Sequence, residues 1–282
     1  MDNRDEIAEH YNQAKGISVV GRNLSKIINI RNMNNYIKSI LINEFTKENA
    51  AVLDLGCGRG GDLRKYKNQN IKYYHGIDIA EKSIEAARER VQKLYPSFIV
   101  KFSAKDAYGT DWDLKQTFDV ISCQFSFHYA FKTKEIFENT VKNISGHLNK
   151  NGSFIATIPN TNVVLGRYGR YGNNYGNQFY RIEFLEKYED IVKKSELFGV
   201  GYNFYLEEAI DNCIEYLIDI KAMIKMFEKY GLKMVLYQDF LQFYNSLCGK
   251  YQDLHEIIIK KRLSIDEQKV IELYSVIVFE KL

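Results

Sequence analysis

The chain has 282 residues, 45% of them hydrophobic, and a formal net charge of +3, which suits one large α/β domain, or a domain with a subdomain, around an ample core. No apolar run is long enough to span a membrane and the first six residues do not form a signal peptide, which excludes an integral membrane protein. The cysteines show no paired spacing, which disfavours a zinc site or disulfides and indicates reduced thiols in a cytosolic or nuclear protein: Cys57, Cys123, Cys213 and Cys248.

The first feature in chain order is a basic segment that contains no acidic residue. It carries Lys15, Arg22, Lys26, Arg31 and Lys38. A basic arm ahead of the main domain predicts contact with phosphate groups. A solvated helix face explains any one of these residues equally well.

A buried strand followed by a glycine loop is expected at Val52-Leu-Asp-Leu-Gly-Cys-Gly-Arg-Gly-Gly-Asp-Leu63. Gly56, Gly58 and Gly61 fit the loose pattern G-x-G-x-x-G, which also occurs in dinucleotide-binding proteins. Asp54 and Asp62 flank this loop, and a pyrophosphate would lie unfavourably between two carboxylates. A ligand with a cationic amine and a sulfonium fits better, and S-adenosylmethionine is such a ligand.

The second expected strand, at 72–78, ends in Asp78, 22 residues beyond Gly56. A carboxylate at the carboxyl end of this strand can accept hydrogen bonds from both hydroxyls of a ribose. Capping of the helix that begins at Ala80 is the alternative role. The spacing favours the ribose, although it does not separate S-adenosylmethionine from NAD.

Strands and helices alternate along the rest of the first half of the chain. Strands are expected at 98–102, 118–123 and 152–158, separated by helices at 61–67, 81–94 and 133–148. This alternation predicts a parallel sheet with helices on both faces. A helix near 206–230, a strand near 233–239, helices near 240–261 and 265–273, and a final strand at 274–280 are expected to follow.

The segment Asn160–Arg181 is rich in glycine, asparagine and tyrosine and carries three arginines. Such a composition predicts a surface excursion or a mobile loop rather than a helix. Aromatic residues interleaved with arginine suit contact with nucleic acid. A loop without a role is an equal alternative.

The segment Gln124-Phe-Ser-Phe-His-Tyr-Ala-Phe131 follows the fourth expected strand directly. Ligands of doubly wound sheets bind outside the carboxyl ends of the strands, so this segment is expected in the cleft. Its aromatic rings predict a stacking platform for a flat base, with His128 and Gln124 available to read polar edges. Packing in the core explains one or two of the phenylalanines.

With this segment the chain resembles the cellular mRNA cap guanine-N7 methyltransferases along its whole length, most closely the small stand-alone enzymes of microsporidian type. The motifs that carry the resemblance are Ile30-Arg-Asn-Met-Asn-Asn-Tyr-Ile-Lys38, Leu53–Asp62, Tyr74-His-Gly-Ile-Asp-Ile-Ala80, Phe118–Phe131 and Asn212-Cys-Ile-Glu-Tyr216. The glycine loop is common to many methyltransferases, whereas Gln-Phe-Ser-Phe-His-Tyr is far more specific. Arg59 departs from the lysine that the family usually has, which keeps the charge but changes the geometry of a phosphate contact.

The resemblance implies a class I S-adenosylmethionine-dependent methyltransferase fold, with a Rossmann-like, mostly parallel seven-stranded sheet and helices on both faces. It implies a single domain over 1–282, with a basic N-terminal arm at 1–50 and a cap-pocket insertion at about 160–230. In the donor site it implies that Lys38 holds the methionine carboxylate, Asp78 binds the ribose and Asp106 reads the adenine amine. The other implied donor residues are Asp54, Gly56, Asp62 and Gln124.

On the acceptor side the resemblance implies that His128 donates to guanine O6 and that Glu215 accepts from guanine N1 and N2. Arg59 and Arg90 are the candidates for the bridging phosphates. The other implied cap-binding residues are Asn34, Phe125, Tyr129, Pro159 and Tyr274.

The implied activity is methyl transfer from S-adenosylmethionine to guanine N7 of 5′-capped RNA. Because N7 already carries an in-plane lone pair, no catalytic residue and no metal are assigned, and positioning is expected to suffice. A monomeric nuclear enzyme is expected, with a capping guanylyltransferase or the tail of RNA polymerase II as candidate partners. A methyltransferase for a small molecule or a protein, and a non-catalytic cap-binding module, are the alternatives; the acids beside the glycine loop disfavour a nicotinamide dehydrogenase.

Overall fold

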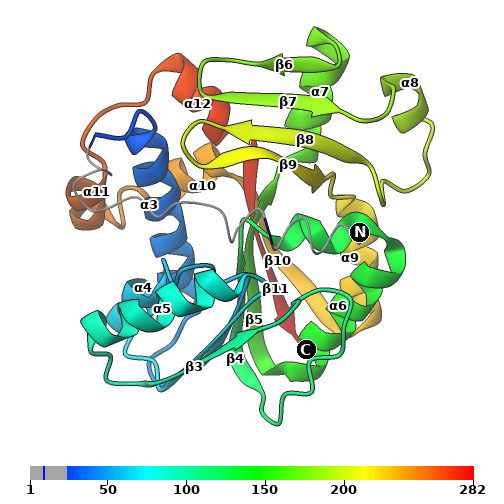
Figure 1. The fold of residues 1–282 in the computed structure, drawn as a ribbon. Helices are drawn as coiled ribbons and strands as arrows, with labels where there is room; N and C mark the ends of the chain where they lie inside the picture. Colours follow the sequence, from blue (N-terminus) through cyan, green and yellow to red (C-terminus); the bar gives the residue numbers. More distant parts are fainter. Residues whose placement is uncertain (1–8, 10–23) are drawn as a thin grey trace.

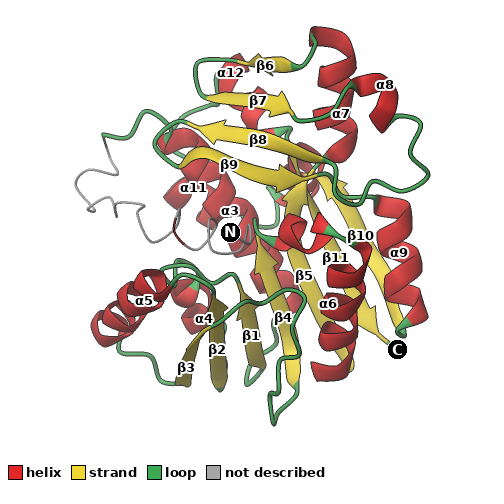
Figure 2. Ribbon diagram, turned by 45° about the vertical axis from the view of Figure 1, so that its right-hand side comes forward, coloured by secondary structure: helices red, strands yellow, loops and turns green. Residues whose placement is uncertain are grey.

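The computed structural model describes residue 9 and residues 24–282, so Lys15 and Arg22 of the basic segment lie outside the described residues. A seven-stranded sheet forms the centre of the molecule, in the order β10-β11-β5-β4-β1-β2-β3 (Figures 1 and 2). Its strands are β1 (Ala51–Leu55), β2 (Tyr73–Asp78), β3 (Ile99–Ala104), β4 (Phe118–Gln124), β5 (Leu148–Pro159), β10 (Leu232–Asp239) and β11 (Tyr274–Lys281).

Neighbouring strands of this sheet run parallel except where β11 pairs with β5 and β10. The alternation of side chains along β1 explains why the sheet is covered on both faces. Val52 packs with α3 (Ile28–Phe45) and α4 (Leu63–Asn68) in one core, whereas Leu53 packs with α6 (Lys134–His147) and α9 (Ile220–Lys229) in the other. The remaining helices of the main layer are α5 (Glu81–Leu94), α10 (Phe240–Leu247), α11 (Gln252–Ile258) and α12 (Ile265–Ile271), with a 3₁₀ helix η1 (Phe127–Lys132) after β4.

A smaller antiparallel sheet is built from the chain between β5 and α9, in the order β6-β7-β8-β9. Figure 1 shows it above the carboxyl ends of the main strands, and β9 packs on η1. Its elements are α7 (Thr161–Tyr171), β6 (Asn174–Gly176), β7 (Tyr180–Phe184), α8 (Tyr188–Ile191), β8 (Gly201–Leu206) and β9 (Ile210–Tyr216). This sheet forms a roof over the edge where ligands of such folds bind.

Two expectations about this region are wrong. The stretch after Asn160 begins with helix α7, because the Asn160 side chain caps it by accepting from the Val163 N–H, and Val164 and Tyr168 bury one face at helical spacing. The helix expected near 206–230 is a hairpin followed by α9. Strand pairing wins there because alternate side chains of β8 are buried in the roof sheet.

Helix α3 buries most of one face against the main sheet, so the basic residues Lys26, Arg31 and Lys38 lie on or beside a core helix. Among the helices of the described residues, none combines the length and the apolar character needed to cross a membrane. From Lys26 onwards, the basic segment therefore belongs to α3 and the turn before it, which pack on the main domain, rather than to a separate arm.

Candidate active site

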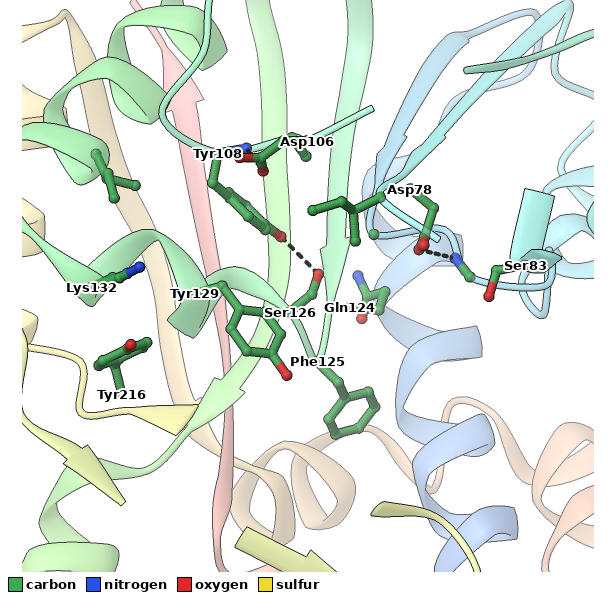
Figure 3. Close-up of a pocket in the computed structure, with 15 residues that line it drawn as sticks. Asp78, Ser83, Asp106, Tyr108, Gln124, Phe125, Ser126, Tyr129, Lys132 and Tyr216 are labelled. Carbon is green, nitrogen blue, oxygen red and sulfur yellow. Dashed lines mark hydrogen bonds between the residues drawn. The ribbon is translucent and has the colours of Figure 1, made fainter. Parts of the chain in front are cut away.

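A cavity of about 240 Å³ opens at the carboxyl ends of β1, β2 and β4, between the two sheets (Figure 3). Residues from the glycine loop, the end of β2, the loop after β3 and the segment after β4 line it. They are Gly56, Gly58, Asp78, Ile79, Ser83, Asp106, Ala107, Tyr108, Gln124, Phe125, Ser126, Tyr129, Lys132, Ile136 and Tyr216. The sheet topology therefore brings five expected donor or cap residues to one place, and Gly56 with them.

The glycine loop needs glycine for two different reasons. Gly56 has a φ of +65°, and a Cβ atom there would lie 2.3 Å from the Ser126 hydroxyl. Gly58 has a φ of +51°, and a Cβ atom there would meet nothing within 4 Å, so this glycine borders open space. The loop thus packs closely on the segment after β4 and leaves room beside Gly58.

Asp78 closes the glycine loop onto the end of β2. One carboxylate oxygen accepts from the Gly58 N–H at 2.8 Å and the other accepts from the Ala80 N–H at 2.9 Å. Burial raises the pKa of Asp78, while these two N–H groups lower it. Each oxygen keeps a lone pair for a further donor, so the contact to the start of α5 and a ribose contact are compatible.

Asp62, Lys38 and Lys65 form a buried charged group behind the glycine loop. The Lys38 ammonium lies 2.9 Å and the Lys65 ammonium 2.6 Å from the Asp62 carboxylate. Burial alone would raise the pKa of Asp62, but the two ammonium groups outweigh it and hold the pKa well below its usual range. Lys38 also lies 5.9 Å from the centre of the Phe125 ring, which lines the cavity.

Asp54 lies under the loop and is not among the residues that line the cavity. It is 2% exposed and accepts a hydrogen bond of 2.7 Å from the Tyr74 hydroxyl. Burial, with repulsion from Asp62 as the next cause, raises the pKa of Asp54 to about 7. When it is ionised, Asp54 adds a second negative charge next to Asp62 below the loop.

The loop after β3 and the end of β4 supply the other polar lining. Asp106 accepts from the Tyr108 N–H at 2.8 Å, and the Tyr108 hydroxyl donates to the Ser126 hydroxyl at 2.8 Å (Figure 3). The Gln124 amide donates to Ser122 at 3.1 Å, while its carbonyl oxygen is buried and accepts no hydrogen bond within the described part of the chain. A buried acceptor of this kind fits a ligand that brings a donor.

Three of the expected walls of a base pocket meet at the end of β5. The Phe125 and Tyr274 rings lie 5.0 Å apart and nearly perpendicular, and Tyr274 pairs with Pro159 across the sheet. Phe125 has a φ of 61°, and its N–H donates to the backbone and side-chain oxygens of Thr157 at 3.1 and 2.9 Å. Those two bonds offset the strain of the left-handed conformation that points the ring at Tyr274.

His128 on η1 and Glu215 on β9 of the roof sheet lie close together and are 2% and 4% exposed. The nearest His128 nitrogen and Glu215 oxygen are 3.7 Å apart, and the Tyr202 hydroxyl donates to the other Glu215 oxygen at 2.9 Å. Burial lowers the pKa of His128 to about 3 and raises that of Glu215 to about 8. At neutral pH both groups are therefore neutral, and their contact is not an ion pair. Tyr129 packs on the His128 ring at 4.2 Å.

Comparison with known proteins matches the whole chain, residues 1–282, to the model of the mRNA (guanine-N(7))-methyltransferase domain. The chain belongs to this family. It is similar to the mRNA cap guanine-N(7) methyltransferase of Candida glabrata, with 32% identity over 98% of this chain and 72% of that protein. It is also similar to mRNA cap guanine-N(7) methyltransferase 1 of Arabidopsis thaliana, with 35% identity over 87% of this chain and 70% of that protein.

The chain spans about half the length of the Cryptococcus neoformans relative, with 31% identity over 98% of this chain and 47% of that protein. Among solved structures, it is similar to the CcbJ methyltransferase of Streptomyces caelestis, with a TM-score of 0.60 and 13% identity over 89% of this chain and 96% of that chain. A second is the magnesium protoporphyrin IX methyltransferase of Synechocystis, with a TM-score of 0.55 and 12% identity over 100% of both chains. The expected family and the expected fold class are both confirmed.

The remaining residues expected from the cap methyltransferase family surround the cavity without lining it. Asn34 is half-buried on α3, and within the described residues its side-chain oxygen has no hydrogen-bond donor. Arg59 lies in the glycine loop, and Arg90 follows Ser83 on α5 by two helical turns, about 10 Å along the helix. The roles of these three residues in cap binding stay predictions.

Several residues that line the cavity were not predicted from the sequence. Ile79, Ala107, Tyr108 and Ser126 directly follow or flank expected residues, so neighbourhood along the chain could have found them. Tyr216 directly follows Glu215 and could have been found in the same way, whereas Lys132 and Ile136 reach the cavity only through the packing of η1 and α6 and gave no local signal. Across the part of the chain that the structure describes, no group of three histidine, cysteine or acidic side chains could hold a metal ion.

Proposed function

We propose that this chain transfers a methyl group from S-adenosylmethionine to N7 of the guanine in the 5′ cap of mRNA. The observation that carries the proposal is the buried Glu215 carboxyl next to His128; each is followed in the chain by a tyrosine, Tyr216 and Tyr129, that lines the cavity. Membership of the mRNA (guanine-N(7))-methyltransferase family supports it.

The residues of the cavity fit the donor. Asp78 keeps lone pairs for a ribose, the Gln124 carbonyl oxygen is a buried acceptor without a donor in the described residues, and Gly58 borders open space. Lys38 and Asp62 match the carboxylate and the ammonium of an amino-acid end. When bound, S-adenosylmethionine supplies an electrophilic methyl group on its sulfonium.

The groups beside the cavity fit guanine. A Glu215 carboxylate can accept from both the N1–H and the N2 amine, and a neutral His128 carries one N–H that can donate to O6. Adenine reverses this pattern, because its unprotonated N1 would face the carboxylate and its amine would face His128. Sites built around such donors and acceptors discriminate strongly, by up to about 10⁴-fold.

The chemistry asks the protein for position rather than for proton transfer. Guanine N7 already carries a lone pair, so no general base has to act on it. Phe125, Tyr274 and Pro159 can hold the base in one plane, and the donor residues can hold the methyl group in line with N7. Well-oriented reactants gain up to about 7–11 kcal/mol in this way. We assign no metal and no nucleophile to the step.

The setting of the activity follows from its substrate. We propose 5′-capped RNA as the acceptor and the nucleus as the place of action, because the relatives are named for mRNA cap methylation. A capping guanylyltransferase or the tail of RNA polymerase II is a candidate partner, and a monomer suffices because one chain supplies the residues proposed for both the donor and the cap.

Methyl incorporation into cap dinucleotides tests the proposal. Wild-type protein should methylate a guanosine-capped dinucleotide and not an adenosine-capped one, and uncapped RNA should stay unmodified. The Glu215→Ala variant should bind S-adenosylhomocysteine with near wild-type affinity in calorimetry and nearly lose guanosine-cap methylation. Equal use of both dinucleotides, or full activity of the variant, would refute the guanine assignment. Cap binding without any methyl transfer would instead identify a non-catalytic module.

A further inference from the structure

Lys65 does not line the cavity, but its ammonium contacts the Asp62 carboxylate. Its ammonium lies 2.6 Å from Asp62 and 3.2 Å from the Asn35 side-chain oxygen. The two residues are three apart at the start of α4, a spacing that places their side chains on one side of the helix. With side chains 12% and 9% exposed, Lys65 and Asp62 form a well-ordered pair shielded from solvent.

The charges around Asp62 are more numerous than one contact to a ligand requires. Two ammonium groups, on Lys38 and Lys65, share a single carboxylate at 2.9 and 2.6 Å. Of the two, Lys38 also approaches the lining, through its position over the Phe125 ring. An amino-acid ligand brings both an ammonium and a carboxylate, so Lys38 is needed for the carboxylate while Asp62 takes the ammonium.

The two lysines are therefore not equivalent once a ligand is present. If Lys38 turns to the ligand carboxylate, Asp62 loses one of its two partners and keeps Lys65. A buried carboxylate left without a fixed cation would be costly, and its orientation would no longer be held. Lys65 stands on α4, a helix that packs into the core and contributes no residue to the cavity lining.

We propose that Lys65 is a positioning residue of the donor site: it holds the Asp62 carboxylate charged and oriented for the ammonium of the donor and leaves Lys38 available for the donor carboxylate. The inference rests on the proposed function only in taking the donor to be S-adenosylmethionine.

Several titratable groups face Asp62 from the surrounding elements. Lys38 comes from α3, Asp54 and Cys57 from β1 and the loop after it, and Lys65 and Tyr66 from α4. Of these, the two lysines lower the pKa of Asp62, whereas Asp54 repels its charge. Removing Lys65 therefore raises the pKa of Asp62, so the acid limb of donor binding moves to higher pH.

Calorimetry with two ligands tests this role. S-adenosylhomocysteine carries the amino-acid end, whereas methylthioadenosine lacks both the ammonium and the carboxylate. The Lys65→Met variant should bind S-adenosylhomocysteine about tenfold more weakly or worse at neutral pH, and bind methylthioadenosine as the wild type does. Its loss should deepen as the pH falls. The Lys65→Arg variant should restore most of the affinity because it keeps the charge.

Two matched variants complete the experiment. Arg64→Met removes a neighbouring exposed charge of the same helix and should leave both affinities unchanged. Asp78→Ala should weaken both ligands, because both carry the ribose. If Lys65→Met does not fold, Lys65→Gln replaces it and the same ligand comparison applies.

Each outcome separates the two hypotheses. Wild-type affinity of Lys65→Met for S-adenosylhomocysteine, or an equal loss for both ligands, would overturn the positioning role while leaving the methyl-transfer proposal intact. Absence of S-adenosylhomocysteine binding in the wild type would overturn the proposed function itself.

Discussion

At the scale of single residues, the protonation state of Glu215 is set by its burial. It is buried between Tyr202 and His128, and burial raises its pKa to about 8. A carboxyl group in this state is neutral at neutral pH. Under the proposed function it would gain its charge when guanine supplies two donors to its oxygens, so that no unpaired charge is buried before the base binds.

The raised pKa of Glu215 has a measurable effect on stability. Between pH 4.5 and about 8 the unfolded chain releases the Glu215 proton while the folded protein keeps it, so the free energy of unfolding falls as the pH rises through this window. Glu215→Gln removes this dependence. In urea denaturation, we expect the free energy of unfolding of the variant, relative to that of the wild type, to increase by up to about 1 kcal/mol per pH unit in this window. A difference that stays constant with pH would place the Glu215 pKa near its ordinary value.

Residues of the cavity were predictable where the chain itself marks them. Asp78 stands at the end of a strand, and the glycines of the loop stand between strand and helix, so local pattern was enough to place them at the cavity. Asp106 was expected through the family resemblance, and its role toward the donor stays a prediction. Lys65 and Tyr202 carried no such mark. Tyr202 meets Glu215 only because the two are partners across β8 and β9, and that register is decided by packing in the roof sheet.

At the scale of elements, η1 links the core to the cavity. Phe127 is fully buried among the rings of Phe131, Phe137, Phe154 and Phe227, while His128 lies next to Glu215 and Tyr129 lines the cavity. The buried Phe127 ring thereby fixes the start of η1, and with it the positions of the polar residues that follow. The sequence predicted a stacking platform here, whereas the structure divides the segment between core and site.

Removing the central ring should therefore be costly. We expect Phe127→Ala to lower the free energy of unfolding by about 3–5 kcal/mol, because it leaves a cavity among four aromatic rings. Urea denaturation measures this loss, with Tyr171→Ala as a control, since Tyr171 is 61% exposed and should change stability by less than about 0.5 kcal/mol. A small effect at Phe127 would mean that the surrounding rings can collapse into the space.

The elements of the roof sheet were the least predictable. Arg167 was a candidate for nucleic acid contact, but its guanidinium donates to the Tyr180 hydroxyl at 2.8 Å, to the Lys269 carbonyl at 2.7 Å and to Glu272. It braces α7 against β7 and α12, which are distant in the sequence. Composition alone could not distinguish such a brace from an exposed basic residue, because both consist of arginine beside aromatic rings.

At the scale of the whole molecule, the two sheets differ in how far the sequence predicted them. Alternating strands and helices and one recognisable family sufficed to predict a mostly parallel seven-stranded sheet, but they did not predict the order of its strands. The roof sheet, with its short antiparallel strands, escaped the same reasoning. Its turns are also bonded to the main domain: the Glu208 carbonyl accepts from Arg31 of α3, and Asn177 donates to the Asp266 carbonyl of α12. Such long-range contacts leave little trace in local pattern.

Charge distribution over the whole molecule bears on the RNA chain. Arg59 lies in the glycine loop and Arg90 on α5, and neutralising phosphate releases counterions, so we expect cap affinity to fall with salt. We expect Arg59→Ala and Arg90→Ala each to raise the apparent constant for capped RNA and to reduce the salt slope by about 0.7 for each phosphate that is no longer neutralised. Titration of fluorescent capped RNA over a salt series measures the slope, and Lys229→Ala on the far helix α9 is the control. Unchanged slopes would place the phosphate path elsewhere, for instance along Arg31.

The segment that carries the roof sheet begins and ends at the same point. The Thr161 hydroxyl donates to the Ile218 carbonyl at 2.8 Å and accepts from the Ile218 N–H at 2.9 Å, so one side chain closes a loop between residues 57 positions apart. A segment closed in this way can change its length or sequence without altering the distances in the rest of the domain. Glu215 lies within it, and Asp62, Asp78 and Asp106 lie outside it. Glu215, the proposed carboxyl partner of guanine, can therefore vary in evolution or by grafting together with the roof sheet, while the other residues proposed for the base, Phe125, His128 and Tyr274, stay in the main domain.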